Sequence, residues 1–192
     1  MAMVDRDRLQ QAFTAIDARN AADPNTITVD GVTRSKELAH AAMMVDWVRR
    51  LCPDPGEALL LAARAHHIRR WVIPRGSFPE GRVGYLQWRN RLKEMHAAEL
   101  RGILESQGYD AALIERACDI LRKRDLTRDP EVQVLEDALC LVFIETQFED
   151  LARKLTPEKL QDVLNKTMRK MSPAAIEIAK KLLPPPVASP HR

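Results

Sequence analysis

The sequence predicts a single all-α domain of seven or eight helices with a C-terminal helical extension. Only 7 of the 192 residues are glycine, and clusters of β-branched or aromatic residues, which are typical of strands, are few. Apolar residues make up 45% of the chain and recur at the spacing of one helix face. A chain of this length and composition can therefore bury a sizeable core between helices.

The first half of the chain is expected to contain four helices separated by two irregular segments. These segments are rich in proline, glycine and asparagine, which break helices, and the first is interpreted as an ordered loop. Asp54-Pro55 marks the start of the third helix, and Gly108 marks the end of the fourth. We expect helices over about 5–22, 35–51, 55–71 and 85–107, with irregular segments over 23–33 and 71–84.

The second half is expected to contain four more helices, each opened by a capping residue. The start signals are Asp110, Asp129-Pro130, Thr156-Pro157 and Ser172-Pro173. The helix that begins at 130 runs to about 155 and is apolar on all sides from 138 to 144, which indicates a central place in the fold. We divide the chain into an N-terminal helix and loop (1–33), a helical core (34–155), C-terminal helices (156–183) and a disordered proline-rich tail (184–192).

Charge and cysteine content indicate a cytoplasmic protein without a membrane partner. Cys52, Cys118 and Cys140 are odd in number and unclustered, which favours free thiols in a reducing compartment. The N-terminus lacks the apolar core of a signal peptide, and no apolar run approaches the ~20 residues that span a bilayer. The net charge of +3 is too small to make nucleic acid the first choice of partner, although it is kept as an alternative.

Four histidines and one aspartate lie within apolar helical stretches, where an unpaired polar group is costly. They are His40, His66, His67, His96 and Asp137. The fifth histidine, His191, lies in the tail and is set aside. Imidazole and carboxylate together are a common ligand set for zinc or another transition metal. The five residues therefore predict one shared divalent metal site, with Mn, Fe, Co, Ni or Zn as candidates. The alternative is that each is a structural residue whose polar group finds its own hydrogen-bond partner.

The order of these residues resembles the HD-domain superfamily of helical metal-binding proteins. The pattern there is a His, a His-Asp doublet and a distant Asp, which His40, His66-His67 and Asp137 match in order. His96 resembles the extra histidine of some branches. The resemblance covers about residues 34–145 and implies an HD-like fold. The doublet here is His-His, and because a neutral imidazole does not bridge two metals, the substitution disfavours a binuclear centre.

A closer resemblance is to domain-of-unknown-function family 4202, a bacterial and fungal family. The segments that carry it are Arg64–Arg75, Gly84–Arg89 and Leu135–Ala138. In that family the second residue of the doublet is the steady histidine, which implies that His67 is a better ligand candidate than His66. Glu37 lies one turn before His40 and is a candidate to orient a ligand imidazole, or simply a carboxylate favoured by the helix dipole. Glu145 and Glu149 are interpreted as surface or ion-pair residues.

The segment from Arg69 to Lys93 is basic and interleaved with aromatic residues. It carries seven cationic side chains against one acid, Glu80, and includes Trp71, Phe78, Tyr85 and Trp88. Arginine at this density suits phosphate or carboxylate binding, and the aromatic rings could stack on a base or pack the loop down. The residues chosen for binding an anionic small-molecule substrate are Arg70, Arg75, Arg82 and Arg89. The alternative is that the arginines are solvated or paired elsewhere.

Three functions remain open from the sequence. The first is an HD-like metal-dependent phosphohydrolase acting on a nucleotide or small phosphorylated metabolite, with Asp137 and His67 as catalytic residues; the metal would generate a hydroxide that attacks phosphorus while arginines neutralise the phosphate. The second is an HD-like iron oxygenase, which the histidine-rich set favours. The third is a non-catalytic module on a degenerate HD-like fold that binds an anion, RNA or a protein, which the His-His doublet favours.

Overall fold

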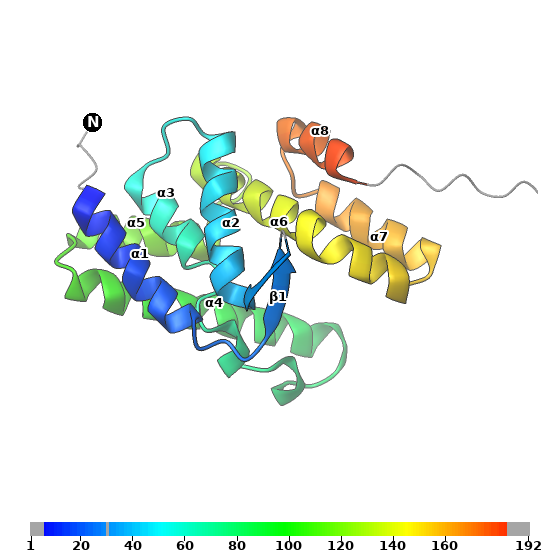
Figure 1. Ribbon diagram of the computed structural model, residues 1–192, viewed down its shortest axis with the longest axis horizontal. Helices are drawn as coiled ribbons and strands as arrows, with labels where there is room; N and C mark the ends of the chain where they lie inside the picture. The colour runs from blue at the N-terminus through cyan, green and yellow to red at the C-terminus, as the bar shows by residue number, and fades with distance from the viewer. Residues whose placement is uncertain (1–5, 30, 184–192) are drawn as a thin grey trace, which may run out of the picture.

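The computed structural model describes residues 6–29 and 31–183, and within them the prediction of an all-α protein is confirmed. Figure 1 shows the helices packed around one another with a single small hairpin. The predicted disordered tail, 184–192, lies outside the described residues. The α-helices are α1 (Arg6–Asn20), α2 (Lys36–Leu51), α3 (Glu57–Arg64), α4 (Gly81–Ser106), α5 (Ala111–Arg122), α6 (Pro130–Lys154), α7 (Pro157–Met168) and α8 (Pro173–Leu182).

The capping signals in the second half of the chain set the helix boundaries as expected. Asp110, Asp129, Thr156 and Ser172 each accept a hydrogen bond from a backbone N–H in the first turn of the helix that follows. Gly108 ends the preceding helix region at φ +71°, which glycine adopts without strain. The long helix α6 packs against α2, α3, α5, α7 and α8. Its central position agrees with its apolar middle, where Ala138, Leu141 and Val142 are buried.

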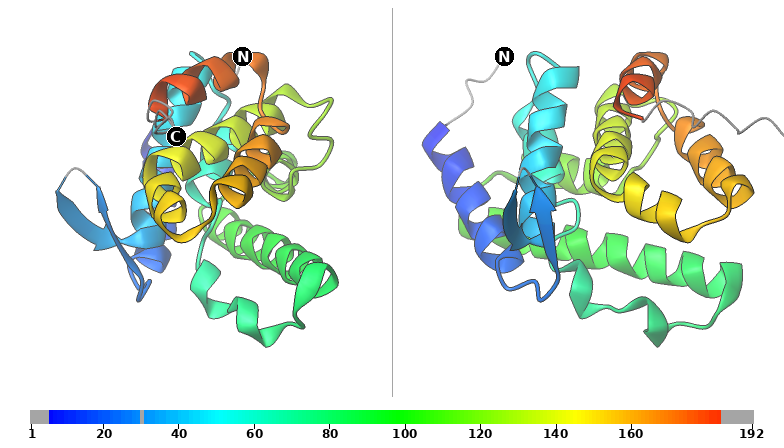
Figure 2. Two further views of the ribbon diagram at one scale, coloured as in Figure 1. Left: turned by 90° about the vertical axis from the view of Figure 1, so that its right-hand side faces the viewer. Right: turned by 45° about the vertical axis from the view of Figure 1, so that its right-hand side comes forward.

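The ordered loop expected at 23–33 is instead a two-stranded antiparallel hairpin. Strand β1 (Thr26–Val29) pairs with β2 (Val32–Ser35), so that Thr26 lies opposite Ser35. Figure 2 shows this hairpin projecting from the helical body. The brief alternation at Ile27 and Val29 was too short to separate a strand from a loop. The hairpin is followed at once by α2, and so fixes where that helix begins.

The third helix is shorter than expected, because tertiary contacts stop it after two turns. It begins at Glu57 and ends at Arg64, and two short 3-10 helices follow, η1 (Arg70–Val72) and η2 (Arg75–Ser77). Arg69 adopts a left-handed conformation at φ 52°, and its N–H donates to the Asn20 side chain at 3.1 Å. A non-glycine residue with these backbone angles is strained, and such strained residues occur often at functional sites. The turn between Arg64 and Arg69 therefore carries His66 and His67 on irregular backbone.

No helix within residues 6–29 and 31–183 is long and apolar enough to cross a membrane.

Gly84 is a point of close backbone approach between α4 and the loop before it. A Cβ atom at this position would lie 1.9 Å from the Pro79 carbonyl oxygen. The same loop is held by Arg75, whose guanidinium donates to the carbonyl oxygens of Phe78 and Pro79 at 3.0 and 2.9 Å. Only glycine lets the first turn of α4 pack this closely on the loop.

We expect Gly84→Ala to destabilise the protein by about 1–3 kcal/mol, since the backbone must shift to relieve the clash. Gly102→Ala is the matched control on the same helix, because nothing lies within 4 Å of its added Cβ. That change should stabilise the protein by up to about 1 kcal/mol through helix propensity. Urea unfolding of both variants measures the two effects, and equal stability of the two would contradict the close approach.

Candidate metal centre

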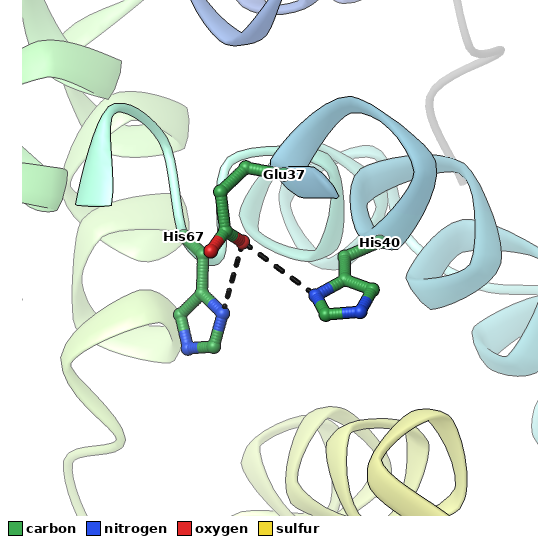
Figure 3. Close-up of side chains that lie close together, drawn as sticks. All are labelled: Glu37, His40 and His67. Atoms are coloured by element: carbon green, nitrogen blue, oxygen red, sulfur yellow. Dashed lines mark ion pairs between the residues drawn. The ribbon is translucent and has the colours of Figure 1, made fainter. Parts of the chain in front are cut away.

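Three side chains converge where the start of α2 meets the turn after α3. They are Glu37 and His40 from α2 and His67 from the turn, and the atoms they can offer as metal ligands all lie within 4.8 Å of one another. Figure 3 shows the Glu37 carboxylate between the two imidazole rings. The side chains of Glu37 and His40 are buried, and that of His67 is 23% exposed. We call these three residues the triad.

The distances within the triad fit a metal ion better than direct hydrogen bonds. Glu37 Oε2 lies 3.3 Å from His67 Nδ1 and 3.6 Å from His40 Nδ1. The same oxygen is buried and has no hydrogen-bond partner of normal geometry. Ligand atoms placed tetrahedrally at 2.0–2.2 Å around one ion are separated by roughly 3.3–3.6 Å. The two carboxylate–imidazole distances therefore match the spacing of ligands around one ion, and the three ligand atoms all lie within 4.8 Å of one another.

The hydrogen bonds around His40 leave a lone pair facing the Glu37 carboxylate. Thr146 on α6 donates its hydroxyl proton to the Val142 carbonyl at 2.7 Å, so its oxygen serves as the acceptor for His40 Nε2 at 3.3 Å. With the proton on Nε2, Nδ1 of a neutral His40 is an acceptor and points at the carboxylate oxygen. Two acceptors that face each other in a buried site are both unsatisfied, and either a proton on His40 or a metal ion would satisfy them.

Glu37 is held in place by a cap that comes from a distant part of the chain. Asp23 is buried, and its Oδ2 accepts from the Glu37 backbone N–H at 3.0 Å. Ser35, the residue before α2, makes no such bond through its side chain. Burial would raise the pKa of the Glu37 carboxyl, but its interactions with His67 and His40 outweigh this effect, so the pKa lies well below its usual value. The carboxylate is therefore ionised at neutral pH.

His96 supports the triad from α4 without belonging to it. Its Nδ1 donates to the Ile68 carbonyl at 2.8 Å, which fixes the turn that carries His67. The ring of His66 packs on that of His67 with centroids 4.3 Å apart, and neither of its nitrogens has a hydrogen-bond partner. His66 and His96 were predicted metal ligands, but in the described residues the group that could hold an ion comprises only Glu37, His40 and His67.

Burial keeps the histidines near the triad neutral. It lowers the pKa of His67 to about 4, against the opposing effect of Glu37, and that of His96 to about 3. The pKa of His66 also lies well below its usual value, first because of burial and then because of nearby positive charge. Neutral imidazole is the form that binds metals, so His67 needs no change in net charge to act as a ligand at pH 7.

Asp137, the predicted carboxylate ligand, lies on the far face of α6 from the triad. It is nine residues from Thr146, the contact of His40, which is two and a half turns of helix and therefore the opposite side. Its Oδ1 accepts from the Ser172 backbone N–H at 2.8 Å and from Gln133 at 3.0 Å. The structure thus uses Asp137 to attach α8, and the carboxylate brought to the histidines is Glu37.

The four arginines chosen from the sequence separate into two groups. Arg70 NH1 donates to His67 Nε2 at 3.3 Å, and its guanidinium lies 4.7 Å from the Trp88 ring centroid. Arg89 donates to the Tyr85 hydroxyl at 3.2 Å and lies on the same side of α4 as Trp88 and Tyr85. Arg75 is occupied by loop carbonyls, and Arg82 is exposed at the start of α4. Only Arg70 therefore reaches the triad directly.

Two spaces lie near the triad. A cavity of about 20 Å³, room for one water-sized species, is lined by His40, His66 and His67 together with residues of α2 and α6. A wider groove of about 820 Å³ runs between the hairpin, α2 and α6 and includes Thr146. Glu145 and Glu149 line this groove, and Glu145 accepts from Trp47 Nε1 at 2.7 Å. The groove is not lined by a triad residue, and its link to the triad is Thr146, which contacts His40.

Comparison with known families places nearly the whole chain in one of them. Residues 10–189 match the family described as Domain of unknown function (DUF4202). No curated protein and no solved structure matches the chain.

We expect the metal-free protein to lose stability as the pH falls from 7 towards 5. The folded-state pKa values of His66, His67 and His96 are depressed, so the unfolded chain binds more protons below pH 6.5. Each such histidine contributes up to about 1.4 kcal/mol per pH unit. Urea unfolding in the presence of chelator measures the slope, and His66→Leu should make it shallower. A stability that does not change between pH 7 and 5 would contradict the buried, neutral state.

Proposed function

We propose that this chain, which belongs to the DUF4202 family, binds one divalent ion of zinc or a first-row transition metal through Glu37, His40 and His67. The observation that carries the proposal is the buried Glu37 Oε2, which has no hydrogen-bond partner of normal geometry and lies 3.6 Å from His40 Nδ1 and 3.3 Å from His67 Nδ1. A proton on His40 would satisfy the pair at the cost of a buried charge; a metal satisfies both imidazoles and the carboxylate together. Two histidines and one glutamate are also the protein ligands of many catalytic zinc sites.

We infer a metal-dependent phosphohydrolase from the groups around this centre. Three protein ligands leave a coordination position for water, whose pKa a divalent metal lowers. Arg70 lies beside His67 and offers a planar pair of donors that suits a phosphate group. The groove along α2 and α6 offers room for the rest of a small phosphorylated substrate. An HD-like relationship remains part of this proposal, with Glu37 taking the place that the sequence pattern gave to Asp137.

Arg70 links metal binding to substrate binding. When Arg70 donates to His67 Nε2, the ring proton is on Nδ1, the atom that faces Glu37. With a metal bound at Nδ1, the ring proton would be on Nε2, which could then no longer accept from Arg70. The Arg70 guanidinium would thereby be free to bind an anionic substrate group close to His67.

An iron-dependent oxygenase is the second candidate, and the ligand set itself favours it. Two histidines and one carboxylate with open positions are also the ligands of many non-haem iron oxygenases. The two functions differ in what they consume. Oxygen uptake that requires Fe(II) would identify the oxygenase, whereas phosphate release under nitrogen would identify the hydrolase.

We expect about one equivalent of Mn, Fe, Co, Ni or Zn per chain in tag-free protein after incubation with these ions. Glu37→Gln and His40→Ala should weaken metal binding more than tenfold, because each removes a ligand. Asp137→Asn is the informative control, since it keeps an acceptor for Ser172 and should leave metal binding unchanged. Metal binding that survives in Glu37→Gln but is lost in Asp137→Asn would overturn the assignment of the triad.

We expect phosphate release from a panel of nucleotides and sugar phosphates to require added metal and to stop in chelator. Glu37→Gln should reduce the rate to background, and Arg70→Leu should raise KM for the phosphorylated substrate while leaving metal content unchanged. Malachite-green detection of phosphate measures both effects. Turnover that persists in chelator and in Glu37→Gln would show that the activity does not use this centre.

A further inference from the structure

A second concentration of charge lies beyond Arg70 and is built from four separate parts of the chain. We call it the basic cluster: Arg70 from η1, Arg89 and Lys93 from α4, Lys123 at the end of α5, and Lys170 between α7 and α8. The carboxylate of Glu136 on α6 lies near Arg89 and the three lysines, and that of Glu37 lies near Arg70. Arg70 and Arg89 were chosen from the sequence. Lys93 lies in the same basic segment but was not chosen, and Lys123 and Lys170 lie far along the chain from it.

Glu136 is the anchor of the basic cluster. Its side chain is buried and forms an ion pair with Lys123, whose own side chain is only 6% exposed. Lys170 Nζ lies 3.8 Å from the other carboxylate oxygen and is 48% exposed. One carboxylate can neutralise only one of these two ammonium groups. The outer one, Lys170, therefore faces solvent with its charge largely uncompensated.

Arg89 connects the lysines to Arg70. Burial lowers the pKa values of Lys93 and Lys123, and the positive charge of Arg89 lowers both of them further. Arg89 also donates to the hydroxyl of Tyr85, whose ring lies 5.9 Å from that of Trp88. Trp88 in turn lies under the guanidinium of Arg70. The packing of Tyr85 and Trp88 thus holds the positive charges of Arg70 and Arg89 close together.

The excess positive charge of the basic cluster indicates how many negative charges its ligand carries. Five cationic side chains lie near two carboxylates, Glu136 beside the lysines and Glu37 beside Arg70, and Glu94, which also lies near Lys93, is already paired with Arg122. A single phosphate group carries roughly −1.5 to −2 charges at neutral pH, so it would leave a positive excess. Two or three linked phosphate groups would balance the cluster and would accept the separated donors of Arg70, Arg89 and Lys170.

We propose that the basic cluster binds the linked phosphates of a small-molecule di- or triphosphate. Arg70 belongs both to this cluster and to the surroundings of His67, so a phosphate chain held by the lysines and Arg89 extends towards the triad. Only the idea that this ligand is the substrate rests on the proposed phosphohydrolase. Binding of the phosphates by the cluster does not require a metal.

The test is isothermal titration of the full chain in chelator with orthophosphate, pyrophosphate and tripolyphosphate. We expect tripolyphosphate and pyrophosphate to bind at least tenfold more tightly than orthophosphate. Arg89→Gln and Lys170→Gln should each weaken tripolyphosphate binding at least fivefold. Arg91→Gln, an exposed arginine on the same helix, is the matched control and should bind as the wild type does. Circular dichroism shows whether each variant is folded.

Three results would overturn the proposal. They are equal affinity for all three anions, unchanged tripolyphosphate binding in both cluster variants, and binding of a single-stranded RNA oligonucleotide without binding of tripolyphosphate. Because the titration is done in chelator, its failure leaves the metal centre untouched. A wild-type protein that binds no metal would likewise leave the basic cluster untouched, so the two proposals are separately testable.

Discussion

The buried carboxylate of Glu37 is the constraint to which the surrounding structure responds. An ionised carboxylate away from water must be compensated, and it is met by His40 from the same helix and His67 from the turn after α3. Each partner is itself braced: His40 by Thr146 on α6, and the His67 turn by His96 on α4. Four elements are thus joined through one anionic group, whose backbone is capped by Asp23 from the chain before the hairpin.

The irregular backbone after α3 also helps to place the side chains around the Glu37 carboxylate. The helical pattern of α3 could continue past Arg64, but Arg69 turns left-handed and is bonded to Asn20. His67 lies in the turn just before Arg69, and Arg70 begins the 3-10 helix just after it, with its guanidinium over the Trp88 ring. The consequence is a site with two adjacent parts, a ligand set that suits a cation and a basic cluster that suits an anion, with Arg70 between them.

Helix starts in the second half of the chain could be predicted from the sequence because capping is a local effect, as the side chains of Asp110, Asp129 and Ser172 show. The start expected at Asp54-Pro55 was wrong, since α3 begins at Glu57 without a side-chain cap. His40 and His67 were also predicted, because a histidine on an apolar face must find a partner. Asp137 also lies in an apolar helical stretch, yet its partner is the backbone N–H of Ser172. The spacing of residues along the sequence does not show which face of α6 packs against α2. Asp23, Lys123 and Lys170 depend on tertiary proximity, for which the sequence carries no local signal.

Anomalous diffraction from crystals soaked in Zn²⁺ or Mn²⁺ tests directly whether one metal ion binds between Glu37, His40 and His67. We expect a single strong peak at roughly 2.0–2.2 Å from Glu37 Oε2 and from one nitrogen of each imidazole, with the guanidinium of Arg70 moved away from His67. A peak that instead involves Asp137, or an unfilled triad in crystals that bind the metal elsewhere, would contradict the assignment of the triad.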